Sequence, residues 1–70
     1  MPKLFSSLHI LEILELHGFR FVSQKGSHVK YRKPGNPTLT VIVPVGRKEI
    51  PVGTFRSILK QSQLAAKDFE

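Results

Sequence analysis

The stretch FRFVSQKGSHVKYRKPGNPTLTVIV, residues 19–43, decides the fold. Its β-branched, aromatic and alternating side chains predict three strands, at residues 19–23, 28–33 and 38–43. Turn residues separate these strands, with Gly26 in the first connection and Pro34-Gly35-Asn36-Pro37 in the second. Strands joined by such short turns form an antiparallel meander.

A helix is predicted on each side of this stretch. Residues 7–17 place six leucine and isoleucine side chains around a polar stripe, as an amphipathic helix does. Residues 52–64 follow Pro51, and their apolar face consists of Phe55, Ile58 and Leu59. For residues 65–70 two outcomes stay open, namely one further turn that packs Phe69 on the core or a frayed end.

The element order is therefore α-β-β-β-α. It predicts an α+β fold of two layers, in which both helices cover one face of a three-stranded antiparallel sheet. The double-stranded-RNA-binding domain has the same order of elements, although element order alone does not establish a function.

Length and composition limit the classes of protein. Seventy residues predict one small domain, residues 1–70, because so short a chain closes one modest core. The absence of cysteine excludes disulfides and thiolate metal sites. No apolar run approaches the roughly 18 residues of a membrane span, and the amino-terminal segment does not have the form of a signal peptide. We therefore expect a cytoplasmic protein.

The charge is unevenly distributed along the chain. Eleven Lys and Arg residues against five Asp and Glu residues give a net charge of +6, and no acidic residue lies between Leu16 and Lys48. The middle of the chain is thus expected to form a cationic surface. Such a surface attracts RNA, anionic lipid or an acidic protein, and it also keeps a small protein in solution.

His28 begins the middle strand, in which alternate residues share a face. Val29 and Tyr31 are expected to point into the core. His28 then shares the opposite face with Lys30 and Arg32. An imidazole exchanges protons near neutral pH, and neighbouring cations can bind a phosphate. These residues by themselves fit either a site that cleaves phosphodiesters or an ordinary exposed histidine in a basic strand.

Metal and cofactor sites are not indicated. His9 and His17 belong to the first predicted helix, and their spacing from His28 does not form a ligand set. No acidic cluster accompanies the histidines, and no glycine-rich phosphate loop is present. We therefore expect no metal and no organic cofactor.

Four segments carry a resemblance to a known family. They are KGSH at residues 25–28, the proline-containing turn after the next strand, VIVP at residues 41–44, and IPVGTFRSILKQ at residues 50–61. With these segments in this order, the chain resembles the HicA toxin family, also called YcfA-like, from its first helix through Phe69.

The resemblance implies the toxin of a type II toxin–antitoxin system. Such a toxin is a metal-independent endoribonuclease, or mRNA interferase, that cleaves messenger RNA on a fold like that of the double-stranded-RNA-binding domain. A HicB-like antitoxin neutralises it by covering the active site. The free chain is expected to be a monomer without a cofactor.

The family's catalytic histidine falls on His28. The candidate RNA-binding residues follow from charge and strand position instead of a family motif, and they are Lys25, Ser27, Lys30, Arg32, Arg47 and Lys48. Two positions depart from the family pattern. Many relatives carry a second histidine where this chain has Val45-Gly46-Arg47, and a glycine often stands in place of Gln63.

Two other classes of function fit the residues without the resemblance. One is a non-catalytic module that binds RNA by shape and charge, for which the basic middle of the chain suffices. The other is a protein-interaction domain whose cationic face meets an acidic partner.

Overall fold

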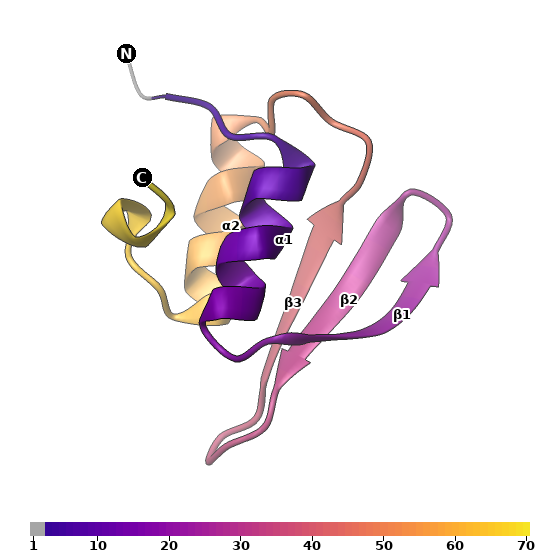
Figure 1. The fold of residues 1–70 in the computed structure, drawn as a ribbon, viewed down its shortest axis with the longest axis vertical. Helices are drawn as coiled ribbons and strands as arrows, with labels where there is room; N and C mark the ends of the chain where they lie inside the picture. Colours follow the sequence, from indigo (N-terminus) through magenta and orange to yellow (C-terminus); the bar gives the residue numbers. More distant parts are fainter. Residues whose placement is uncertain (1–2) are drawn as a thin grey trace.

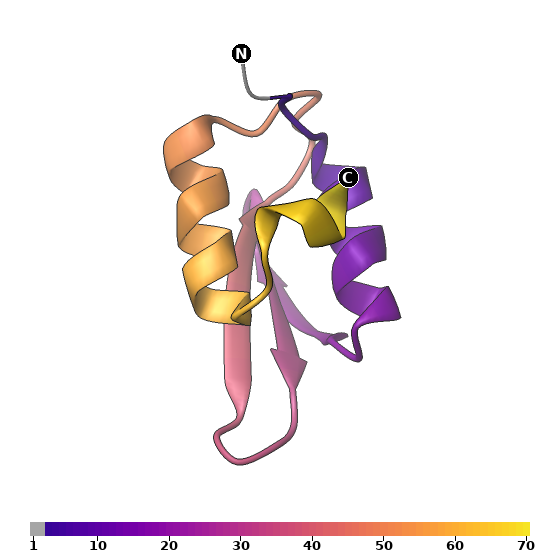
Figure 2. The same cartoon turned by 90° about the vertical axis from the view of Figure 1, so that its left-hand side faces the viewer.

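The computed structural model of the protein describes residues 3–70. Both helices lie on one face of a three-stranded sheet (Figures 1 and 2). This arrangement confirms the α-β-β-β-α order and the α+β fold. The elements are helix α1 (Ser7–Leu16), strands β1 (Arg20–Lys25), β2 (His28–Lys33) and β3 (Leu39–Pro44), helix α2 (Val52–Ser62) and the 3-10 turn η1 (Ala66–Phe69). Within residues 3–70, no helix is long and apolar enough to cross a membrane.

The sheet is the predicted antiparallel meander, with β2 between β1 and β3. The register pairs His28 with Lys25 on one side and with Pro44 on the other. A bulge between Phe21 and Ser23 leaves Val22 without a partner on β2. Gly26, at φ 58°, supports the two-residue connection between β1 and β2.

The predicted limits of β1, residues 19–23, were wrong at both ends. Helix α1 ends in a Schellman motif, in which the N–H of Gly18 bonds to the carbonyl of Glu15 and the N–H of Phe19 bonds to that of Leu14. Gly18 takes the left-handed φ of 94° that this motif requires. Phe19 therefore belongs to the helix end, and β1 begins one residue later and continues to Lys25.

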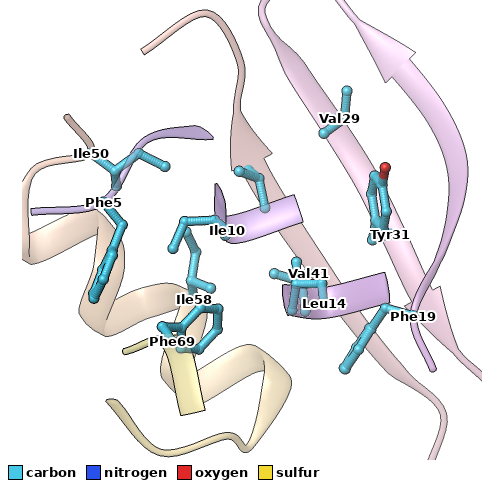
Figure 3. Packing of buried hydrophobic residues seen from close by; sticks show 11 residues of the cluster. Phe5, Ile10, Leu14, Phe19, Val29, Tyr31, Val41, Ile50, Ile58 and Phe69 are labelled. Atoms are coloured by element: carbon cyan, nitrogen blue, oxygen red, sulfur yellow. The ribbon is translucent and has the colours of Figure 1, made fainter. Parts of the chain in front are cut away.

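The core is one cluster of eleven buried apolar side chains between the helices and the sheet (Figure 3). Its members are Phe5, Ile10, Leu14, Phe19, Val29, Tyr31, Val41, Val43, Ile50, Ile58 and Phe69. Every element contributes to it except β1, all six of whose residues are exposed.

The turn η1 lies across the outer side of the two helices (Figure 2). The Phe69 ring is fully buried there, with its centroid 6.4 Å from that of Phe5 and 5.3 Å from that of Phe55. His9 stacks on Phe5 and bonds through Nε2 to the carbonyl oxygen of Phe69. The carboxyl-terminal turn is thus packed on the core, which was one of the two outcomes that the sequence left open.

Candidate functional site

His28 lies at the start of β2, on the sheet face that points away from the helices. Its neighbours Val29 and Tyr31 are buried against the helices, so the alternation of the strand turns His28 outward. The side chain is exposed. Because paired residues share a face, Lys25 of β1 flanks His28 on this face.

His28 opens onto a hollow in this sheet face. The hollow is lined by Ser23, Lys25, His28, Val29, Lys30 and Ile42. Lys30 occupies the next row along β2, between Ser23 of β1 and Ile42 of β3. The structure therefore brings together three of the predicted site residues, Lys25, His28 and Lys30. Ile42 contributes a partly exposed apolar side chain to the lining, and it was not predicted as part of the site.

Ser27 belongs to the turn before β2. Its Oγ lies 3.5 Å from Nδ1 of His28, which is longer than an ordinary hydrogen bond. A hydrogen bond between this hydroxyl and the imidazole would fix which ring nitrogen carries the proton.

Arg32 shares the face of His28 but lies outside the hollow, two rows farther along β2. It pairs with Arg20 and with Thr40, whose hydroxyl lies 3.5 Å from its Nε. The Arg20 guanidinium is turned back toward α1, where it donates hydrogen bonds to the carbonyls of Glu15 and Phe19 at 3.0 and 2.8 Å. Arg32 therefore extends the cationic surface along the strand.

Arg47 and Lys48 lie in the loop between β3 and α2, also outside the hollow. The N–H of Val45 bonds to the carbonyl of Ser27 at 2.8 Å, which holds this loop beside the β1–β2 turn. Both cations are exposed and lie at the end of the sheet where His28 is found.

Ser7 anchors this loop to the start of α1. Its buried hydroxyl donates a hydrogen bond to the carbonyl of Pro44 at 2.6 Å and accepts one from the N–H of Arg47 at 3.1 Å. The N–H of Ser7 in turn bonds to the carbonyl of Arg47 at 2.9 Å. Sequence reasoning did not identify this contact, since nothing in the local pattern links residues 7 and 44.

The side chains of the remaining two histidines contact main-chain carbonyls away from the hollow. His9 bonds to the carbonyl of Phe69, and Nδ1 of His17 lies 3.0 Å from the carbonyl of Ile13 in the last turn of α1. In the part of the chain from residue 3 onward, no three His, Cys, Asp or Glu side chains gather as a metal site.

The register places no carboxylate among the paired residues of the outer sheet face. These residues are Arg20, Ser23, Lys25, His28, Lys30, Arg32, Thr40, Ile42 and Pro44. Such a face attracts an extended polyanion. An anionic group bound by the ammonium groups of Lys25 and Lys30 would lie beside the exposed imidazole, which can donate a proton to it or accept one from it.

Comparison with known proteins agrees with the earlier resemblance. A search of curated proteins found no match. A family model, described as the HicA toxin of bacterial toxin–antitoxin, matches residues 9–64. The match covers well over half of the 70 residues and includes most of α1, the whole sheet and α2. The chain therefore belongs to the HicA toxin family of bacterial toxin–antitoxin systems.

Proposed function

We propose that the protein is a metal-independent endoribonuclease, the mRNA interferase of a type II toxin–antitoxin system. His28 acts as its general acid or base, and a HicB-like antitoxin neutralises it by covering the hollow. The observation that carries the proposal is the exposed His28 between Lys25 and Lys30, on a sheet face without paired carboxylates.

RNA supplies its own nucleophile in this reaction. The 2′-oxygen attacks the adjacent phosphorus, the bond from phosphorus to the 5′-oxygen breaks, and the products are a 2′,3′-cyclic phosphate and a 5′-hydroxyl. The protein must accept the proton of the 2′-hydroxyl, stabilise the charged phosphorane and supply a proton to the 5′-oxygen.

His28 performs one of the two proton transfers in this proposal. Lys30 stabilises the phosphorane from the next row of the sheet, and Lys25 or Ser27, on the other side of His28, handles the second proton directly or through water. Arg32, farther along β2, and Arg47 and Lys48, in the loop after β3, hold the flanking phosphates outside the hollow.

Replacing His28 by alanine tests the catalytic assignment. A general acid or base typically contributes about 10² to 10⁴ in rate, so the cleavage of a labelled transcript by purified His28→Ala protein is expected to slow by that factor. RNA binding and the fold are retained, because the side chain is exposed and bonds no core residue. Growth inhibition by the expressed protein is lost as well.

His17→Ala is the matched control, since this histidine lies at the end of α1 and is expected to leave cleavage unchanged. Cleavage by His28→Ala at the parental rate contradicts the assignment. If the parent protein binds the transcript without cutting it, the protein is instead a non-catalytic RNA-binding module. Adding the protein encoded by the adjacent reading frame is expected to abolish cleavage, as an antitoxin would.

A further inference from the structure

The two edges of the sheet differ in how their main-chain groups are satisfied. At the β3 edge, the N–H of Ile42 donates a hydrogen bond to Oε1 of Gln61 from α2 at 2.9 Å. Pro44 has no N–H to expose, and its carbonyl accepts the Ser7 hydroxyl. Side chains of both helices thus occupy the β3 edge.

The β1 edge has no such cover. The N–H of Ile42 points away from β2, so Ile42 and its partner Lys30 form a pair without hydrogen bonds between them. By the alternation of the ladder, the N–H and C=O groups of Lys30 therefore point toward β1. The same alternation directs the N–H and C=O groups of Phe21 and Gln24 away from β2. No other segment of residues 3–70 pairs with β1, and all six of its residues are exposed. Unpaired groups of this kind can bind an added strand.

Exposed apolar side chains gather beside this edge. Leu16 at the end of α1 is 80% exposed, and Phe21 and Val22 of β1 are 57% and 41% exposed. A hollow between α1 and β1 is lined by Glu12, Glu15, Leu16, Arg20 and Phe21. A group of exposed apolar side chains around a hollow is typical of a site that binds another protein.

The charges of β1 define the segment that fits. The register places Arg20 and Lys25 on the outer face of the sheet, and the Arg20 guanidinium is turned back at the β1 edge to the carbonyls of Glu15 and Phe19. Phe21 lies on the face toward α1, next to Tyr31. A strand added here would meet cations on one face and apolar surface on the other. Its residues must therefore alternate between acidic and apolar.

A second copy of β1 fits less well. Antiparallel pairing of two β1 strands about their centre places Arg20 opposite Lys25, and like charges at directly opposite positions are destabilising. The occupant is thus expected to be a different chain.

We propose that the β1 edge is a docking site for an extended segment of a protein partner with alternating acidic and apolar residues. The acidic side chains face Arg20 and Lys25, and the apolar side chains cover Phe21 and Leu16. This site adjoins the His28 hollow and shares Lys25 with it, and the proposal holds whether or not the protein cleaves RNA.

A synthetic seven-residue peptide, with capped ends and glutamate and valine at alternating positions, is the probe. Peptide binding to the isotope-labelled protein is expected to slow hydrogen exchange of the Phe21 and Gln24 amides. A peptide of the same composition with its glutamates contiguous is expected to bind about tenfold more weakly, because its charges fall on both faces.

Gln24→Pro is the decisive variant. It removes an N–H that points away from β2, so it spares the β1–β2 ladder while it removes one bond to the added strand. We expect peptide affinity to fall about tenfold, the equivalent of one hydrogen bond, whereas Gln24→Ala retains the N–H and binds as the parent does. Should Gln24→Pro fail to fold, Phe21→Ala takes its place with Leu8→Ala, another exposed apolar side chain, as control.

Three results would overturn the proposal. The first is unchanged amide exchange in β1 at millimolar peptide, and the second is equal affinity of the Gln24→Pro and Gln24→Ala proteins. The third is slowed exchange of the Phe21 and Gln24 amides that depends on protein concentration without peptide, which would make a second copy the occupant. Transcript cleavage is measured on the same variants and is expected to be unchanged. A failure of the docking proposal can therefore be told apart from a failure of the proposed ribonuclease activity.

Discussion

Tyr31 links the central strand to α1 through one hydrogen bond. Its hydroxyl donates to a carboxylate oxygen of Glu15 at 2.9 Å, and its ring is buried. Burial raises the pKa of Tyr31 above its ordinary value of 10.0, and the hydrogen bond to Glu15 and the negative charge of Glu15 raise it further. The neutral phenol is favoured because a phenolate here would lose hydration and face another anion.

The raised pKa of Tyr31 makes stability depend on alkaline pH. The folded protein holds this proton more tightly than the unfolded chain does, so the stabilisation is complete below pH 10 and is lost as the pH rises through the pKa of the folded state. We expect the free energy of unfolding in urea to fall in that window. The fall should be shallower for Tyr31→Phe, which loses about 1 kcal/mol at neutral pH with its hydrogen bond.

Phenolate absorbance measures the Tyr31 pKa directly, because the chain has one tyrosine and no tryptophan. Titration of the folded protein at the ordinary tyrosine pKa would contradict the expectation.

At the scale of the elements, α2 ends under backbone strain. Gln63 takes the left-handed conformation, at φ 61° and ψ 23°, and its N–H bonds to the carbonyl of Leu59 at 2.8 Å. A side chain is disfavoured in this conformation, whereas glycine adopts it freely. Gln63→Gly is therefore expected to stabilise the protein by about 0.5–1 kcal/mol in urea unfolding.

The control for Gln63→Gly is Lys60→Gly, at an exposed position inside the same helix. There glycine costs about 1 kcal/mol, because it only adds freedom to the unfolded chain. A loss of similar size in both variants would show that Gln63 is not strained.

The predicted limits of an element were accurate where the pattern of apolar and polar side chains determines them. They were less accurate where main-chain hydrogen bonds determine them. The limits of β2 agree with the alternation of buried Val29 and Tyr31 with outward-facing neighbours. The limits of β1 were wrong because the Schellman motif takes Phe19 into the helix end. The bulge at Val22 depends on how two strands fit together, which the residues of one strand do not determine.

At the scale of the whole molecule, the candidate site was predicted in part. The alternation of β2 places His28 and Lys30 on one face, so this part of the hollow follows from the sequence. The pairs of Lys25 with His28 and of Ser23 with Lys30 depend on the two-residue connection at Gly26, and they were missed because the first strand was predicted to end at residue 23. The pairing of Arg20 with Arg32 depends on the bulge and was missed. The roles of all these residues in RNA cleavage stay predictions.

The distribution of charge leads to a last prediction, on RNA binding. Lys30 lies on the outer sheet face, whereas the equally charged Arg56 is exposed on α2, across the sheet. If RNA lies along the outer face, losing one phosphate contact lowers the slope of log affinity against log salt concentration by about 0.7 to 0.9. We expect this change for Lys30→Ala and none for Arg56→Ala, with both changes made in the His28→Ala protein so that the RNA stays intact. Equal slopes for the two variants would mean that RNA binds through the net charge of the protein without preferring the face that carries His28.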